Sequence, residues 1–115
     1  MTVKIYHNPR CTKSRQTLAL LEERGLAPQV IEYLQTPPSV KELDAILKQL
    51  GKQPRELMRK HEAPYKEQNL DDPAKSRADL LAAMVAYPIL IERPIVLANG
   101  KAAIGRPPEN VLAIL

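Results

Sequence analysis

Residues 7–15 read HNPRCTKSR and stand between a short apolar strand pattern and the start of an amphipathic helix. Cys11, the only cysteine of the chain, falls where the strand pattern ends. A thiolate attacks electrophiles, and both a helix N-terminus and nearby cations favour this deprotonated form of a thiol. Arg10, Lys13 and Arg15 supply positive charge close to Cys11 in the sequence. We therefore predict that Cys11 is a thiolate nucleophile rather than a small buried hydrophobic residue.

Length and composition limit the architecture and the partners. The 115 residues are enough for one domain with a hydrophobic core, so we expect a single domain over residues 1–115. With no Trp and no Phe, the core must be aliphatic, and we expect the four tyrosines at its margins. Lys and Arg are scattered among acidic residues, and no aromatic-rich strand offers a surface on which bases could stack. We expect a monomer without a nucleic-acid partner.

The cysteine count and the apolar runs indicate a compartment. A single cysteine cannot form an intramolecular disulfide, and no charged segment followed by an apolar one opens the chain. No stretch approaches the roughly 20 apolar residues that cross a bilayer. One Cys with one nearby His does not fill a tetrahedral metal site. We expect a soluble, cytoplasmic protein with no membrane association, no metal and no bound cofactor.

The first third of the chain predicts a βαβ unit. A strand pattern around Ile5 is followed by a helix from about Cys11 to Arg24 and by a second strand over 29–33. Gly25 is suited to the end of the helix. A helical crossover joins parallel strands, so we expect these two strands to be parallel.

The rest of the chain predicts helices and a hairpin. Ser-x-x-acid patterns mark the starts of two helices, and an Asn-Gly pair marks a tight antiparallel turn. The expected elements are a helix from Ser39 with Glu42, a short helix from Pro54 to Met58, an irregular mobile stretch over 60–73, a helix from Ser76 with Asp79, a hairpin around Asn99-Gly100, and a last helix burying Val111, Leu112 and Leu115.

Three motifs carry a resemblance to a known family. They are HNPRCTKSR over 7–15, ERPI over 92–95 and IGRPPE over 104–109. In this order they resemble the glutaredoxin-dependent arsenate reductases, the ArsC family of the thioredoxin-like superfamily, over nearly the whole chain. The resemblance implies an α/β thioredoxin-like fold: a mixed four-stranded sheet flanked by helices, with a helical insertion.

The resemblance also implies roles for four residues. Cys11 would attack the arsenic of bound arsenate, and Arg59, Arg93 and Arg106 match the positions whose guanidinium groups bind the oxyanion. The side-chain chemistry agrees with these roles, because a planar guanidinium can donate to two oxygens of a tetrahedral anion and keeps its charge.

Three further residues would support the nucleophile. His7 would orient the loop or tune the thiol, or it would be a strand-end histidine bonded to the backbone. Ser14 would donate a hydrogen bond to the thiolate, or it would cap the first turn of the helix. Asn8 would hold the loop in shape, since Asn readily caps turns.

The lack of a second cysteine implies an external thiol. The resemblance implies that glutathione is the co-substrate and glutaredoxin the partner. The implied cycle is attack by Cys11 on arsenate, attack by glutathione on the adduct, and reduction by glutaredoxin with release of arsenite. Two alternatives stay open. One is a Spx-like regulatory protein, which typically lacks the late arginine and often has Cys-x-x-Cys, whereas position 14 here is Ser14. The other is a glutathione-dependent thiol reductase without arsenate activity.

Overall fold

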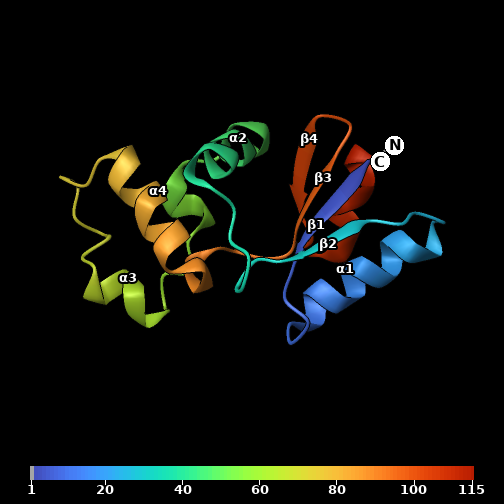
Figure 1. Ribbon diagram of the computed structural model, residues 1–115, viewed down its shortest axis with the longest axis horizontal. Helices are drawn as coiled ribbons and strands as arrows, with labels where there is room; N and C mark the ends of the chain where they lie inside the picture. The colour runs from blue at the N-terminus through green and yellow to red at the C-terminus, as the bar shows by residue number, and fades with distance from the viewer. Residues whose placement is uncertain (1) are drawn as a thin grey trace. The chain divides into compact units, whose positions relative to one another are not determined.

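Figure 1 presents a computed structural model, which describes residues 2–115. Within that range four strands form one sheet: β1 (Val3–His7), β2 (Gln29–Glu32), β3 (Ile95–Ala98) and β4 (Lys101–Ile104). Their order is β2-β1-β3-β4, with β1 and β2 parallel and the other two pairs antiparallel. The mixed four-stranded sheet predicted from the sequence is confirmed.

Helix α1 (Thr12–Glu23) makes the crossover between the two parallel strands. Cys11 is its N-cap and Arg24 its C-cap, so both predicted ends are correct to within one residue. Gly25 follows with a φ of +75°, a left-handed conformation that glycine adopts without a steric penalty. The predicted βαβ unit is therefore present.

The hairpin between β3 and β4 turns at Asn99 and Gly100, which both have positive φ angles, 55° and 72°. Positive φ at both central residues is typical of the tight turn that matches the twist of antiparallel strands. The register pairs Ile95 with Ile104, as an Asn-Gly turn directly between the strands requires.

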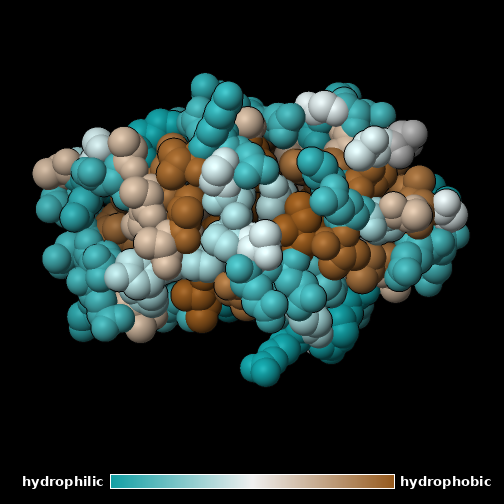
Figure 2. Space-filling model, in the orientation of Figure 1, coloured by the Kyte–Doolittle hydropathy of each residue, from teal (hydrophilic) through white to brown (hydrophobic). Residues whose placement is uncertain are grey.

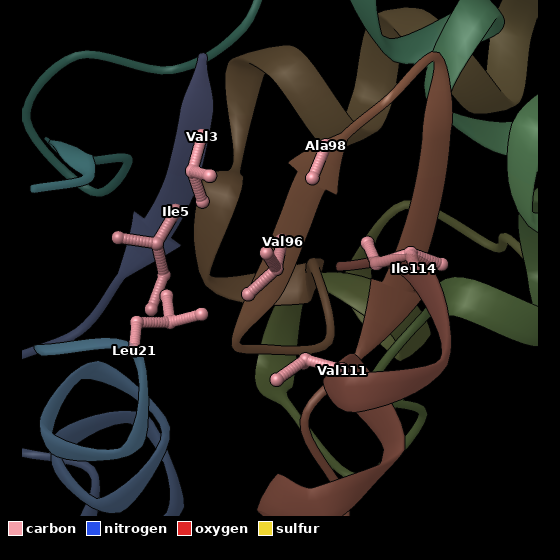
Figure 3. Packing of buried hydrophobic residues seen from close by; sticks show 7 residues of the cluster. All are labelled: Val3, Ile5, Leu21, Val96, Ala98, Val111 and Ile114. Carbon is pink, nitrogen blue, oxygen red and sulfur yellow. The ribbon is translucent and has the colours of Figure 1, made fainter. Parts of the chain in front are cut away.

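The chain forms two compact units, and the first consists of the residues up to Thr36 together with Arg93–Leu115. Its core lies on one face of the sheet, because alternate residues of a strand point to the same side. Figure 3 shows the core cluster, whose buried members are Val3 and Ile5 of β1, Val96 and Ala98 of β3, Leu21 of α1, and Val111 and Ile114 near the C-terminus. This cluster fixes α1, and with it Cys11, against β1.

The C-terminal segment is a 3-10 helix, η3 (Pro108–Ile114), and not an α-helix. It packs against α1, β3 and β4. A 3-10 helix has three residues per turn, and the buried residues Pro108, Val111 and Ile114 follow that period. The predicted inward set is therefore confirmed for Val111, and Leu115 is partly buried against the core cluster. The set was wrong in omitting Ile114, which is buried, and in including Leu112, which is only half-buried.

The second unit, Pro37–Glu92, is helical. Its elements are α2 (Val40–Leu50), η1 (Pro54–Leu57), α3 (Ala63–Glu67), α4 (Arg77–Ala86) and η2 (Pro88–Leu90). Helix α4 packs against α2, η1 and η2. This unit is the helical insertion predicted from the sequence.

Local sequence signals position the helices of the second unit. Ser39 with Glu42, and Ser76 with Asp79, both form capping boxes, as predicted. The stretch over 60–73 was predicted to be irregular, but it contains α3, so that prediction is wrong for Ala63–Glu67. Pro64 stands in the first turn of α3, where the missing N–H of proline has no helical partner to lose.

Two tyrosines lie in the interior, contrary to the expectation that all four would stand at the margins of the core. Tyr33 is 1% exposed and Tyr6 is 4% exposed, whereas Tyr65 is half-buried and Tyr87 is exposed. In a chain without Phe or Trp, tyrosine is the only side chain that can fill a large interior space with an aromatic ring.

On the surface, hydrophobic residues appear in patches between hydrophilic ones on the face that Figure 2 shows. The large hydrophobic residues that are exposed are Val30, Leu34, Val40, Tyr87 and Ile89. Over the described range of the chain, none of the helices has the length and apolar character needed to cross a membrane.

Candidate active site

The loop from β1 to α1 is held by a polar contact that follows from strand alternation. His7 lies on the same face of β1 as Val3 and Ile5, which is the face that α1 covers. There His7 Nδ1 lies 2.6 Å from Ser14 Oγ, and both side chains are buried. The backbone N–H of Asn8 donates to the same hydroxyl over 3.0 Å. Ser14 thus joins the end of the strand to the first turn of the helix.

Asn8 and Arg15 organise the rest of the loop. The carbonyl oxygen of Asn8 accepts from the N–H of Cys11, and its side-chain oxygen accepts from the N–H of Arg10, each over 3.0 Å. Arg15 donates to the carbonyl of Pro9 over 2.9 Å and to Thr12 Oγ1 over 3.3 Å. The sequence interpretation counted Arg15 only as a nearby charge; in the structure it binds the loop.

Cys11 is buried, with 7% of its surface exposed. Burial by itself would raise the pKa of its thiol, but this effect is outweighed. The backbone N–H of Ser14, the charges of Arg93 and Arg106, and the N–H of Lys13 together hold the pKa below its ordinary value. The site therefore favours a thiolate at the N-terminus of α1, the position where the backbone N–H groups have no helical acceptor.

Arg106 makes direct contact with the sulfur. Its Nη2 lies 3.5 Å from Cys11 Sγ, and its Nε donates to the carbonyl of Arg93 over 2.8 Å. The carbonyl of Arg106 accepts from Asn110 Nδ2 over 2.9 Å. Side chain and backbone of this arginine are thus both fixed, although the residue is exposed.

Arg93 precedes β3 by two residues and is half-buried. Its Nε is a buried nitrogen without a hydrogen-bond acceptor among residues 2–115, while other atoms of the residue do interact. Arg93 and Arg106 each precede a proline, Pro94 and Pro107, and both peptide bonds are cis. The two guanidinium groups that act on the Cys11 thiol therefore come from two separate X-Pro loops.

Arg59 belongs to the second unit, where its side chain is 16% exposed. Its Nη1 lies 3.2 Å from Glu62 Oε1, and its Nη2 lies 3.3 Å from His61 Nε2. Its backbone N–H donates to the carbonyl of Leu90 over 2.7 Å. The sequence did not indicate that Glu62 would pair with this arginine.

The first unit thus gathers an activated sulfur and two guanidinium groups. A thiolate can attack the central atom of an electrophilic oxyanion, and guanidinium groups can bind its oxygens through paired N–H donors. Across the described range, no cluster of three or more His, Cys, Asp or Glu residues could hold a metal ion. The arrangement suits nucleophilic attack on a small tetrahedral anion.

The comparison with protein families agrees with this geometry. The sequence model of the ArsC family matches residues 6–114. The chain belongs to the ArsC family. The match includes Cys11, Arg59, Arg93 and Arg106, all of which lie inside the matched range.

Relatives and solved structures of ArsC type cover nearly the whole chain. A protein of Neisseria meningitidis serogroup B named arsenate reductase is 54% identical over 114 residues, which are 98% of this chain and 97% of the relative. An arsenate reductase of Haemophilus influenzae is 53% identical over 116 residues, covering 100% of both chains. The structure of an arsenate reductase from Vibrio cholerae matches with a TM-score of 0.96 and 59% identity, covering 100% of this chain and 98% of that one. These matches agree with the thioredoxin-like fold.

Proposed function

We propose that this ArsC-family protein is an arsenate reductase that depends on glutathione and glutaredoxin, with Cys11 as its nucleophile. The observation that carries the proposal is the 3.5 Å contact between Arg106 Nη2 and the buried Cys11 sulfur, because it joins a thiol and an anion-binding group. The names of the relatives from Neisseria and Haemophilus support arsenate as the substrate.

The reaction begins with attack of the Cys11 thiolate on arsenic. A sulfur–arsenic bond forms, an arsenic–oxygen bond breaks, and the oxygen leaves as water after protonation. Glutathione then attacks the arsenic of the adduct, so that a second sulfur–arsenic bond forms and a second oxygen leaves as water. The glutaredoxin thiol attacks the glutathione sulfur, a sulfur–sulfur bond forms, and the bond from glutathione to arsenic breaks with its electron pair left on arsenic. Hydrolysis of the bond between Cys11 and arsenic takes up one water, releases arsenite and returns Cys11 to its thiol form. In total, arsenate and two thiols give arsenite, one disulfide and one water, so that arsenic gains the two electrons that the sulfur atoms lose.

The arginines bind and orient the oxyanion in this proposal. Arg93 and Arg106 offer guanidinium groups whose charges already act on the Cys11 thiol. Arg59 is the third proposed ligand. Its guanidinium group is paired with the carboxylate of Glu62, so the anion would compete with this carboxylate for it. His7, Asn8 and Ser14 support the nucleophile by fixing the loop that carries it.

An external thiol is required because Cys11 is the only cysteine of the chain and position 14 is serine. A disulfide within the chain cannot form, so the oxidised sulfur must be resolved by a second molecule. The glutathione and glutaredoxin of the cytoplasm are suited to this task. No bound cofactor is part of the proposed cycle.

The test is NADPH consumption with arsenate, coupled through glutathione, glutaredoxin and glutathione reductase. Cys11→Ser is expected to abolish turnover, because no other thiol can attack arsenic. A parallel reaction with a glutathione mixed disulfide distinguishes the reductase from a thiol reductase without arsenate activity. Turnover of the disulfide alone would replace the proposed substrate, and turnover by Cys11→Ser would remove Cys11 from the mechanism.

The anion-binding role has its own variants. Arg93→Ala or Arg106→Ala is expected to lower kcat/KM for arsenate by at least about tenfold, the loss expected for one charge-assisted hydrogen bond. Arg10→Ala is the matched control, because Arg10 is exposed and adjacent to Cys11 in the sequence. Equal kinetics of the Arg106 and Arg10 variants would make Arg106 an ordinary surface charge.

A further inference from the structure

Gly105 lies between β4 and Arg106 at a place where a side chain does not fit. A Cβ at this position would overlap Thr17 Oγ1 and would lie 2.9 Å from Pro94 Cγ and 3.0 Å from Thr17 Cγ2. Two of these three atoms belong to one buried side chain of α1. Glycine is therefore required here by the close approach of the backbone to a helix.

Thr17 provides a fixed surface for this approach. It is fully buried on the same face of α1 as Ser14, three residues earlier. Its hydroxyl donates to the carbonyl of Lys13 over 2.7 Å and lies 3.5 Å from the carbonyl oxygen of Gly105. The side chain that meets Gly105 is thus anchored on the turn that begins at Cys11.

The segment after Gly105 is tied to the other X-Pro loop as well. The N–H of Gly105 donates to the carbonyl of Pro94 over 3.0 Å, and Arg106 Nε donates to the carbonyl of Arg93 over 2.8 Å. Gly105 is therefore in contact with both elements that meet at the sulfur, the helix and the Arg93 loop. A shift of its backbone would move the next residue, Arg106, directly.

We propose that Gly105, seated against Thr17 and Pro94, is the positioning residue that sets the distance between the Arg106 guanidinium and the Cys11 sulfur. The absence of a side chain at position 105 allows the 3.5 Å contact between Arg106 and Cys11. A methyl group added to Gly105 or to Thr17, where the two residues pack together, lengthens that distance. The catalytic meaning of this distance rests on the proposed function. The distance itself affects the thiol whether or not arsenate is the substrate.

The test measures the pH dependence of Cys11 alkylation by iodoacetamide, in the absence of arsenate. Gly105→Ala adds a methyl group from the loop side. Thr17→Ile replaces the hydroxyl by an ethyl group, whose methyl extends from the helix side beyond the position of Oγ1. Both are expected to raise the pKa of the thiol by about one unit, and so to lower the thiolate fraction below that pKa about tenfold. Arsenate turnover is measured in a separate assay. A wild-type protein that does not reduce arsenate would contradict the proposed function but not this inference.

Control variants separate positioning from a general loss of stability. Gly25→Ala is the matched glycine control, because a Cβ there has no neighbouring atom within 4 Å although φ is +75°. It is expected to lower the melting temperature while the alkylation profile stays that of the wild type. Thr17→Val, which keeps the shape of the side chain and lacks the hydroxyl, distinguishes the added volume from the lost hydrogen bond.

The double variant Gly105→Ala with Thr17→Ala keeps the test decisive if Gly105→Ala alone does not fold. It removes both threonine atoms that the new methyl group would meet, and leaves the contact with Pro94 Cγ. A return of the thiol pKa toward the wild-type value supports the inference. A folded Gly105→Ala protein with the wild-type profile, or a folded double variant with a fully raised thiol pKa, overturns it.

Discussion

His7 and Cys11 lie four residues apart, and the fold lowers the pKa of both. For Cys11 the effect of burial is outweighed by N–H groups and by the charges of two arginines. For His7, burial is itself the largest cause; the charge of Glu32 opposes it and the charge of Arg15 adds to it. A lowered pKa favours the thiolate of cysteine and the neutral ring of histidine. The loop therefore favours the anionic form of the sulfur and the uncharged form of the imidazole.

The lowered pKa of His7 predicts a pH dependence of stability. The unfolded chain binds a proton to this ring at an ordinary pKa near 6.5, whereas the folded chain takes it up only at lower pH. Protonation thus favours unfolding, so the contribution is complete above about pH 6.5 and declines as the pH falls toward the folded value. His7→Asn is expected to reduce the difference in unfolding free energy between pH 7.5 and 5.5, measured in urea.

A second variant tests the sign of this effect. Glu32 raises the pKa of His7, and the register of the sheet pairs the two residues. Glu32→Gln should therefore lower that pKa further and steepen the dependence on pH, opposite to His7→Asn. Changes of the same sign in both variants would contradict the role given to His7.

Some of these residue properties could be predicted and others could not. The placement of Cys11 at a strand-to-helix junction follows from local patterns, and so does the nearness of Ser14 on the next turn. The interpretation that Arg10, Lys13 and Arg15 supply the charge was wrong in its residues: the charges that lower the thiol pKa are those of Arg93 and Arg106. Residues adjacent in sequence at the start of a helix point in different directions around its axis. Their positions in the sequence therefore do not show which of their side chains approaches the sulfur.

At the scale of elements, the capping boxes were the most reliable signals. The hydroxyl of Ser39 accepts from the N–H of Glu42 over 3.1 Å, and Glu42 Oε1 accepts from the N–H of Ser39 over 3.0 Å. These bonds join groups within four residues, so the sequence specifies them without reference to the rest of the fold. The 3-10 form of η3 was not predictable in this way, because its packing against β4 and α1 decides which side chains are buried.

The cap of α2 gives a prediction on stability. Ser39→Ala removes the acceptor for the N–H of Glu42 and is expected to lower the free energy of unfolding by about 1 kcal/mol. Lys41→Ala, at an exposed position of the same turn, is the matched control and is expected to stay within about 0.5 kcal/mol of the wild type. Urea unfolding followed by circular dichroism measures both. Equal stability of the two variants would show that the cap contributes nothing.

At the scale of the whole molecule, the chain path relates the two units. The first unit takes β1 from the start of the chain and β3 from beyond residue 92, so its sheet is completed only after the second unit has been passed. The single domain expected from the sequence stays a prediction. If the chain is a single domain, both units must unfold together.

Calorimetry tests that prediction. One transition with equal calorimetric and van't Hoff enthalpies is expected, as for most single domains under about 150 residues. Sedimentation equilibrium at the same concentrations checks the expected monomer, which would have a mass of 12.9 kDa. Two separate transitions, with the helical signal lost in only one of them, would show that the units are independent domains.

The sequence by itself determined the position of Cys11 at the strand-to-helix junction, the order of the strands along the chain, the hairpin turn and the helix caps. Each depends on residues a few positions apart, whose local conformations follow from steric and hydrogen-bonding preferences. The resemblance implied that Arg93 and Arg106 bind the oxyanion that Cys11 attacks, but only the tertiary structure shows that Arg106 contacts the sulfur from 95 residues away. It alone shows that Gly105 meets Thr17 across 88 residues. Contacts over such separations arise from the packing of η3 and the hairpin against α1, which local patterns do not encode.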